Sequence, residues 1–271
     1  MINKKLQPFT FIIRASGEAT VGDLKSQLKK QISRNDVLIT LDDEVSFEEK
    51  LRQGYDLAIK IGNEVSVFID GDILMRSNAV KRIRKIAQRL EESDFGFGLK
   101  LWDRFYDRPK FRGLHIYNTK LLNDALKFIP KQGEQLRPES FVKDQMKESG
   151  KRWRNDFSFY VAGLHDFYQK PQDIYYKFLV RSKRSIDDIQ ELKSAFKSMP
   201  TNSDYKMALK GLEDGEQMEE VLNDKYLYSS QKLMLEHSLP IKSRNSRFVD
   251  VLIMKRLIQY YKINSLFWKS I

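Results

Sequence analysis

The sequence predicts an α/β protein in which the first three strands form a parallel sheet. Strand-like apolar segments alternate with amphipathic helical segments through the first third of the chain, the order that gives right-handed crossover connections. Each of these strands also stops at charged residues. Because ligands bind outside the carboxyl ends of the strands in such sheets, the residues there form the first candidate site. They are Arg14, Asp42, Asp43, Asp70 and Asp72.

The first part of the chain supplies these three strands and the helices between them. The strands are predicted at residues 9–13, 37–41 and 65–74. Apolar positions repeat at helical spacing from Val21 to Ile32, which predicts the first helix. The second helix starts at Ser46, whose hydroxyl serves as an N-cap, and Glu49 completes a capping box.

The remainder of the chain continues the pattern and then changes character. Helices are predicted at residues 77–92 with Ser77 as the cap, in a short segment ending near 128 and at 139–150. Strands are predicted at 95–102 and within 156–162, before the Gly-Leu-His-Asp sequence. The breaker-rich residues 130–140 predict a loop over the site. Beyond Arg181 the sequence is charged and helical. We therefore expect a domain at residues 1–180 and a basic helical extension at 181–271.

Composition excludes several classes of protein. The 271 residues include no cysteine, which rules out disulfides, thiolate zinc sites and cysteine nucleophiles. No stretch reaches the roughly 18 consecutive apolar residues that a membrane-spanning helix needs, and the N-terminus does not have the pattern of a signal peptide. We therefore expect a cytoplasmic protein. The formal net charge of +11 predicts an anionic partner, which is nucleic acid, an acidic membrane surface or a phosphorylated substrate.

The Asp-Gly-Asp sequence gives the most specific chemical signal. An apolar strand that ends on Asp70 and Asp72 must supply these carboxylates with a cation or a hydrogen-bonding ligand. Hard oxygen ligands suit Mn²⁺ or Mg²⁺ carrying the phosphates of a substrate. Gly71 lets the backbone come close to the bound group. The alternative is an ordinary surface turn, because Asp and Gly are common turn residues.

These residues resemble the GT-A nucleotide-sugar glycosyltransferases of the Asp-x-Asp type, including bacterial enzymes of surface-polysaccharide synthesis. The resemblance covers about the first two-thirds of the chain and implies a Rossmann-like mixed sheet flanked by helices. It implies nucleotide-sugar contacts from the first-strand loop, the acid that ends the second strand, the second helix and the acidic motif. The residues in these positions are Arg14, Glu18, Asp42 or Asp43, Arg52, Asp70 and Gly71.

The resemblance also implies the residues of the metal and of catalysis. Asp72 matches the direct metal ligand, and His165, in Gly-Leu-His-Asp, matches a late histidine ligand. Glu139 fits a catalytic base that takes the proton of the acceptor hydroxyl. It lies in Pro-Glu-Ser, whereas inverting members commonly have Glu-Asp, so inversion and retention both remain open. His115, within a predicted strand, is interpreted as structural.

Three further groups have predicted roles. Trp102, Tyr106 and Phe111 are candidates for a sugar-stacking platform, or else core residues. Arg181, Lys183 and Arg184 are candidates to neutralise a diphosphate, or else a solvated helix start. The C-terminal helix is basic and amphipathic, so it either lies on the anionic inner face of a membrane or packs on the catalytic domain.

The leading prediction is a metal-dependent glycosyltransferase. It transfers a sugar from a nucleoside diphosphate, with UDP favoured, to a saccharide or lipid-linked acceptor in surface glycan synthesis. The first alternative is a sugar-phosphate nucleotidyltransferase, although the first loop, ASGEAT, has no lysine to hold a triphosphate. The second is a basic nucleic-acid-binding protein without catalysis, which no recognised motif supports.

Overall fold

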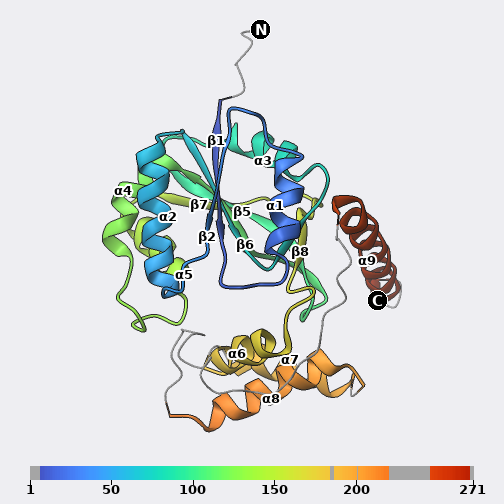
Figure 1. The fold of residues 1–271 in the computed structure, drawn as a ribbon. Helices are drawn as coiled ribbons and strands as arrows, with labels where there is room; N and C mark the ends of the chain where they lie inside the picture. The colour runs from blue at the N-terminus through green and yellow to red at the C-terminus, as the bar shows by residue number, and fades with distance from the viewer. Residues whose placement is uncertain (1–6, 184–185, 200, 220–244, 269–271) are drawn as a thin grey trace.

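The computed structural model describes residues 7–183, 186–199, 201–219 and 245–268, and its centre is one eight-stranded mixed sheet (Figure 1). The strands follow the order β2-β1-β3-β6-β5-β8-β4, and β7 pairs with β5 beside this path. Helices cover both faces of the sheet. The prediction of an α/β fold with a mixed sheet, flanking helices and a helical C-terminal part is thus confirmed.

The parallel half of the sheet explains why the first charged residues meet. β1 (Phe9–Arg14) lies between β2 (Val37–Leu41) and β3 (Val65–Asp70), and all three run in the same direction. The crossover helices are α1 (Val21–Lys29) and α2 (Phe47–Ile61). The register pairs Arg14 with Asp70, so the last residues of two strands lie side by side.

The other half of the sheet is largely antiparallel. The long hairpin of β5 (Asp94–Asp103) and β6 (Arg108–Asn118) pairs through β6 with β3. After Asp70 the chain leaves the sheet centre for β4 (Ile73–Met75), at the far edge beside β8 (Gly163–His165). The acidic motif therefore lies where the chain crosses from the middle of the sheet to its edge. The remaining strand is β7 (Arg152–Asn155).

Two hydrophobic clusters hold the helices on the sheet. On one face, Phe11 and Ile69 pack with α1 and α3 (Ala79–Ala87). On the other face, Ile12 and Phe68 pack with α2, α4 (Leu122–Ala125) and α5 (Pro138–Glu148). Successive strand residues point to opposite faces, so one apolar run serves both clusters. Short 3₁₀ turns at Thr119–Leu121 and Leu126–Phe128 flank α4, and the second ends at the predicted residue 128.

The two predicted helix caps have different outcomes. The Ser46 hydroxyl accepts a hydrogen bond from the Glu49 backbone N–H at 3.2 Å, which confirms the predicted N-cap of α2. Ser77 does not cap α3, because Asn78 is the N-cap residue there. The Ser77 hydroxyl instead donates to the carboxylate of Asp250, which lies in a helix 173 residues later in the chain. Ser77 therefore bonds to a distant acid and does not have the capping role that the sequence suggested.

Three C-terminal helices pack as a group beyond one end of the sheet (Figure 1). They are α6 (Pro171–Arg181), α7 (Ile186–Lys197) and α8 (Ser203–Gln217). Phe105, from the turn between β5 and β6, inserts among them, with its ring 4.6 Å from that of Phe178. α8 approaches α6 closely, because a Cβ on Gly211 would lie 2.4 Å from the Tyr175 carbonyl oxygen. The predicted boundary after residue 180 falls in the last turn of α6 and stays a prediction.

The last helix, α9 (Ser246–Trp268), packs against the edge of the sheet formed by β8 and β4. Val249 and Ile253 are fully buried there. Trp102 belongs to the same cluster, with its ring 5.9 Å from Tyr260, so it is a core residue and not part of a sugar platform. The packing alternative predicted for this helix is therefore what the structure shows. No helix in the described ranges has both the length and the apolar character to cross a membrane.

Candidate active site

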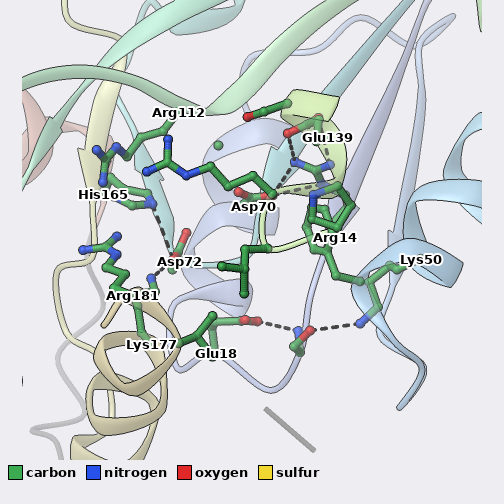
Figure 2. A pocket seen from close by; sticks show the side chains of 18 of the residues that line it. Arg14, Glu18, Lys50, Asp70, Asp72, Arg112, Glu139, His165, Lys177 and Arg181 are labelled. Atoms are coloured by element: carbon green, nitrogen blue, oxygen red, sulfur yellow. Dashed lines mark hydrogen bonds and ion pairs between the residues drawn. The ribbon is translucent and has the colours of Figure 1, made fainter. Parts of the chain in front are cut away.

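A cavity of about 460 Å³ opens at the carboxyl ends of β1 and β3, between α5 and α6 (Figure 2). Six of the residues predicted for catalysis, nucleotide-sugar binding or metal binding line it. They are Arg14, Glu18, Asp70, Asp72, Glu139 and His165. They come from four segments, which are β1 with its loop, β3 with the acidic motif, α5 and β8. Two groups of polar and charged residues lie at the cavity, with Tyr117, Asp103 and Asp166 behind its lining. We call them the Arg14 cluster (Arg14, Asp70, His115, Tyr117, Glu139, Lys143) and the Asp72 cluster (Asp72, Asp103, His165, Asp166, Lys177).

The Arg14 cluster is built around a buried guanidinium. Arg14 Nη2 lies 2.6 Å from Asp70 Oδ1, and Arg14 Nη1 lies 3.0 Å from Glu139 Oε1 (Figure 2). The guanidinium also lies over the ring of Phe47, with 5.0 Å from its carbon to the ring centroid. Its side chain is only 2% exposed. Arg14 therefore joins β1, β3 and α5 across the floor of the cavity.

Glu139 has several donors for its carboxylate. Tyr117 Oη donates to Oε1 at 2.6 Å, and His115 Nδ1 lies 2.9 Å from the same oxygen. Burial raises the pKa of Glu139, but the charges of Arg14 and Lys143 and the hydrogen bond to His115 outweigh it and hold the pKa well below its usual range. A carboxylate stabilised in this way is a weak base. The catalytic-base role of Glu139 stays a prediction, and the geometry suits it to holding Arg14 and α5 in place.

His115 lies between Glu139 and Lys143. The Lys143 ammonium can only donate, and its Nζ lies 3.1 Å from His115 Nε2, so Nε2 accepts and Nδ1 donates to Glu139. The imidazole is therefore neutral. Burial and the charge of Lys143 lower the pKa of His115 to about 4, although Glu139 opposes them.

The Asp72 cluster has the composition of a metal site. Asp72, His165 and Asp166 each offer one ligand atom, and these atoms all lie within 4.8 Å of one another. His165 Nε2 faces Asp72 Oδ2 at 3.6 Å (Figure 2). His165 Nδ1 lies 3.0 Å from Asp103 Oδ2. A carboxylate that accepts from one imidazole nitrogen orients the other nitrogen toward a metal. Asp103 itself is held by Arg112 at 2.9 Å.

An unpaired oxygen of this cluster supports the fit of a divalent cation. Asp72 Oδ1 is buried and has no hydrogen-bond partner among the described residues. Asp166 Oδ2 makes no hydrogen bond either, but His165 Nδ1 and Arg181 Nη2 lie 3.3 and 3.5 Å from it. Buried carboxylate oxygens without donors are costly unless a cation meets them. Asp166 also has a backbone φ of 65°, a left-handed conformation that costs energy in a non-glycine residue. Two carboxylates and one imidazole suit Mn²⁺ and are compatible with Mg²⁺.

Asp166 and Asp103 were not predicted as site residues. Asp166 follows His165 directly, and that adjacency was the one available signal. Asp103 is 62 residues before His165 in sequence, and only the pairing of β5 with β8 brings the two together. A strand of three residues such as β8 has too little periodicity for this pairing to be predicted.

Cations from α6 border the Asp72 cluster. Lys177 Nζ lies 2.6 Å from Asp72 Oδ2 and also contacts the Asp166 carboxylate. Arg181, predicted to face a diphosphate, lines the cavity, with Nη2 3.5 Å from Asp166 Oδ2. Lys183, in the same prediction, donates to the carbonyl of Met218 and is not among the lining residues. Arg184 lies outside the described residues. Lys177 was not predicted, because a lysine on an amphipathic helix has no distinguishing sequence signal.

The loop after β1 is held by a second unpredicted lysine. Lys50 is buried and donates to the Ala15 carbonyl and, at 3.0 Å, to the Ser16 hydroxyl. Glu18 accepts from the Ser16 backbone N–H at 2.5 Å. A Cβ on Gly71 would lie 2.6 Å from Glu18 Oε2, so the glycine allows this loop to pack against the acidic motif. Gly71 itself does not line the cavity.

Two predicted nucleotide contacts lie away from the cavity lining. Asp42 is exposed in the loop between β2 and α2. Arg52 is 42% exposed, with its Nε 4.0 Å from Glu49 Oε2. Neither belongs to the lining residues, and their roles stay predictions. Of the aromatic residues predicted for a sugar platform, Tyr106 and Phe111 do line the cavity.

Comparison with known proteins identifies similar structures at low sequence identity. No protein-family model and no curated protein sequence matches the chain. The mannosyltransferase PcManGT from Pyrobaculum calidifontis, in complex with GDP-Man and Mn²⁺, has 12% identity and a TM-score of 0.47 over 94% of this chain and 88% of that one. Residues 1–349 of TarS from S. aureus have 11% identity and a TM-score of 0.44 over 84% and 75%. A cytidylyltransferase from Leptospira borgpetersenii has 15% identity and a TM-score of 0.42 over 72% and 96%. A mannosyltransferase and a cytidylyltransferase are thus both among the similar structures.

Proposed function

We propose that this protein is a metal-dependent glycosyltransferase that uses a nucleoside diphosphate sugar, with UDP the favoured nucleotide. The observation that carries the proposal is the group formed by Asp72, His165 and Asp166, with the buried Asp72 Oδ1 lacking a hydrogen-bond partner among the described residues, at a cavity that cations also line. These three residues would hold Mn²⁺ or Mg²⁺, which neutralises the diphosphate as it leaves the sugar. The acceptor is a saccharide or lipid-linked hydroxyl compound in surface glycan synthesis.

The residues of the chain have distinct roles in this proposal. Arg181 faces the cavity from α6 and stabilises the negative charge that grows on the leaving diphosphate. Glu18 and the β1 loop that Lys50 holds lie toward the nucleotide. Arg14 fixes Asp70 beside the metal-binding residue Asp72. Tyr106 and Phe111 line the cavity and are the candidates to stack against the acceptor sugar.

Calorimetry with UDP and GDP, each with and without Mn²⁺, tests the proposal. We expect binding of at least one nucleoside diphosphate that strengthens with Mn²⁺ and is lost in Asp72→Asn. Asp124→Asn is the control, because this acid on α4 is exposed and pairs with Lys127. Absence of binding to either nucleotide in the presence of Mn²⁺, by wild-type protein that gives a cooperative melt, would overturn the proposal.

A second candidate function is sugar-phosphate nucleotidyl transfer, and Lys50 is the observation in its favour. The first loop has no lysine of its own, but Lys50 reaches it from α2 and lines the cavity. The two activities differ in their products. A nucleotidyltransferase releases pyrophosphate from a nucleoside triphosphate and a sugar phosphate, whereas a glycosyltransferase releases a nucleoside diphosphate from a nucleotide sugar. Assays for these two products, run on the same preparation, decide between them.

A lipid-linked acceptor would lie in a membrane, and we propose that α9 makes a peripheral contact with an anionic membrane surface. The buried face of α9 is occupied by the sheet edge, but a second stripe along the helix is exposed and apolar. Its members are Phe248, Val251, Met254 and Ile258, with Arg247 and Lys255 exposed beside them. Each basic residue near an acidic surface contributes about 1 kcal/mol.

Sedimentation with vesicles tests this contact. We expect salt-sensitive binding to phosphatidylglycerol vesicles, and loss of that binding when Val251 and Ile258 are both changed to Ser. Met199→Ser is the control, because Met199 is exposed and lies outside α9. Equally weak sedimentation with phosphatidylglycerol and phosphatidylcholine vesicles would exclude the contact.

A further inference from the structure

Lys177 occupies the centre of the candidate metal site. Its Nζ lies 2.6 Å from Asp72 Oδ2 (Figure 2). It also contacts the Asp166 carboxylate, so one ammonium joins both acidic ligands. Asp166 is fully buried, and the Asp72 side chain is only 10% exposed. The two carboxylates outweigh the burial of the lysine and raise the pKa of Lys177, so the ammonium stays charged.

The side chain of Lys177 has room to leave this position. It is 25% exposed, and it lines the same cavity as Arg181. Lysine is a flexible point charge without a fixed hydrogen-bonding plane, so it can exchange one anionic partner for another. An anion bound in the cavity therefore lies within the region that the freed ammonium can reach.

We propose that Lys177 is a built-in competitor of the metal, whose ammonium holds the Asp72 and Asp166 carboxylates together until a divalent cation displaces it toward the diphosphate of the donor. This inference rests on the proposed metal-dependent function. It adds that the metal is bound tightly only when an anionic ligand receives Lys177.

The charges explain why such an exchange links the metal to the donor. One ammonium neutralises one of the two carboxylate charges, and the other cation beside them is Arg181, 3.5 Å from Asp166 Oδ2. A divalent cation at the position of the ammonium neutralises both carboxylates by itself. The displaced ammonium then lacks a partner, unless a diphosphate is present to accept it. Binding of the nucleotide therefore strengthens binding of the metal, and by linkage the metal strengthens binding of the nucleotide to the same extent.

The affinity for Mn²⁺ in the absence of nucleotide tests the inference, measured by calorimetry or by the electron paramagnetic resonance signal of free Mn²⁺. In Lys177→Met we expect Mn²⁺ to bind about tenfold more tightly than in wild type, because one charge-assisted hydrogen bond no longer has to be broken. UDP should then increase the affinity for Mn²⁺ less than it does in wild type. Lys177→Arg keeps the positive charge and should not show the gain.

Lys210→Met is the matched control, because Lys210 also pairs with a carboxylate, that of Asp214 at 2.7 Å, but does not line the cavity. If Lys177→Met binds Mn²⁺ no more tightly than wild type, the inference is overturned while the proposed function stands. If wild type and all variants fail to bind Mn²⁺ even with UDP, the proposed function fails, and the inference fails with it.

A second measurement uses the wild-type protein and does not depend on the folding of a variant. Acetylation of Lys177 by a succinimidyl ester, followed by mass spectrometry, reports whether the ammonium is held by its carboxylates. We expect Mn²⁺ alone to increase the labelling rate of Lys177 and addition of UDP to reduce it again, with Lys210 unchanged. A labelling rate that is the same with and without Mn²⁺ would contradict displacement.

Discussion

The two halves of the cavity contain similar residues but differ in how completely those residues are paired. In the Arg14 cluster, the Glu139 carboxylate has Arg14, His115 and Tyr117 as partners. In the Asp72 cluster the two carboxylates share Lys177 as a cation, but Asp72 Oδ1 is buried without a hydrogen-bond partner among the described residues. A buried carboxylate whose oxygens all have partners fixes the structure around it, whereas a buried oxygen without a donor is retained at a cost in stability. The comparison indicates that the first cluster is scaffold and the second is the place where a ligand binds.

The two histidines show the same difference. Burial lowers the pKa of His115, and the neighbouring ammonium of Lys143 adds to that effect. Burial would lower the pKa of His165 too, but Asp166, Asp72 and Asp103 outweigh it and raise that pKa. An imidazole surrounded by carboxylates is placed where positive charge is favoured. The side chains around each histidine, and not the imidazole itself, therefore decide whether that half of the cavity favours positive or negative charge.

Glu139→Gln gives the largest expected effect on stability and tests the scaffold half. The change leaves the buried guanidinium of Arg14 without one of its two carboxylates, which typically costs about 3–5 kcal/mol in free energy of unfolding. Urea denaturation measures this loss. Glu148→Gln is the control, because this residue of the same helix is exposed and its carboxylate accepts a hydrogen bond from Gln145.

The same variant separates the scaffold role of Glu139 from the base role predicted for it. If Glu139 acts chiefly as the catalytic base, turnover of the nucleotide sugar would disappear while the free energy of unfolding stays within about 0.5 kcal/mol of the control, the range typical of surface substitutions. That result would contradict the comparison between the two halves.

Asp103→Asn has the next largest expected effect and tests the ligand-binding half. The carboxylate accepts from His165 Nδ1 and Arg112 at Oδ2, and from the backbone N–H groups of Phe105 and Tyr106 at Oδ1. An amide has only one acceptor oxygen, so it cannot serve both sides, and the imidazole loses its orientation toward Asp72. Loss of such a supporting carboxylate typically weakens metal binding by about 10–100-fold. Calorimetry with Mn²⁺ and UDP measures the change.

Asp107→Asn is the control for this experiment, because Asp107 lies on the turn of the same hairpin and contacts Trp102 and Arg256. If the affinity for Mn²⁺ is the same in Asp103→Asn and in Asp107→Asn, His165 does not depend on Asp103, and the assignment of the metal site would need revision.

The pH dependence of stability gives the smallest expected effect. His115 has a pKa of about 4 in the folded protein and about 6.5 in the unfolded chain, so the unfolded state binds more protons between these values. Stability therefore falls as the pH drops from 6.5 toward 4, and the loss between pH 6.5 and 5 is roughly 1.5 kcal/mol.

His115→Gln should remove this contribution and flatten the pH dependence of unfolding in that range, measured by urea denaturation at each pH. The groups that face His115 are Glu139, Lys143 and Tyr117. Glu139 titrates at lower pH, because its pKa is held well below its usual range. An unchanged slope between pH 6.5 and 5 in the variant would show that His115 is not held neutral.

The sequence was sufficient to predict the features that depend on the order of strands and helices along the chain. Alternation of strands and helices was sufficient to place Arg14 beside Asp70, because parallel strands joined by crossover helices end at one edge of the sheet. The strand bounds 37–41 match β2. The sequence also predicted that the C-terminal helix is amphipathic. Which of its apolar side chains are buried depends on the edge of the sheet against which α9 packs.

The remaining parts depend on contacts between distant segments. Lys177 reaches Asp72 across 105 residues, and Asp103 reaches His165 across 62. The first contact depends on where the group of C-terminal helices docks, and the second on a three-residue strand. Neither arrangement leaves a periodic pattern in the sequence. The same reason explains why Lys50 and Lys143, single lysines on amphipathic helices, were missed although both line the cavity.

Anomalous diffraction at the manganese edge, from crystals soaked with Mn²⁺ and UDP, tests the central claim most directly. We predict one strong peak within coordination distance, about 2.0–2.3 Å, of an oxygen of Asp72, Nε2 of His165 and an oxygen of Asp166. Lys177 should then have moved from its position between the two carboxylates to the diphosphate. A peak that lies elsewhere in the cavity, or no peak while Lys177 still joins Asp72 to Asp166, would contradict the assignment of the metal site.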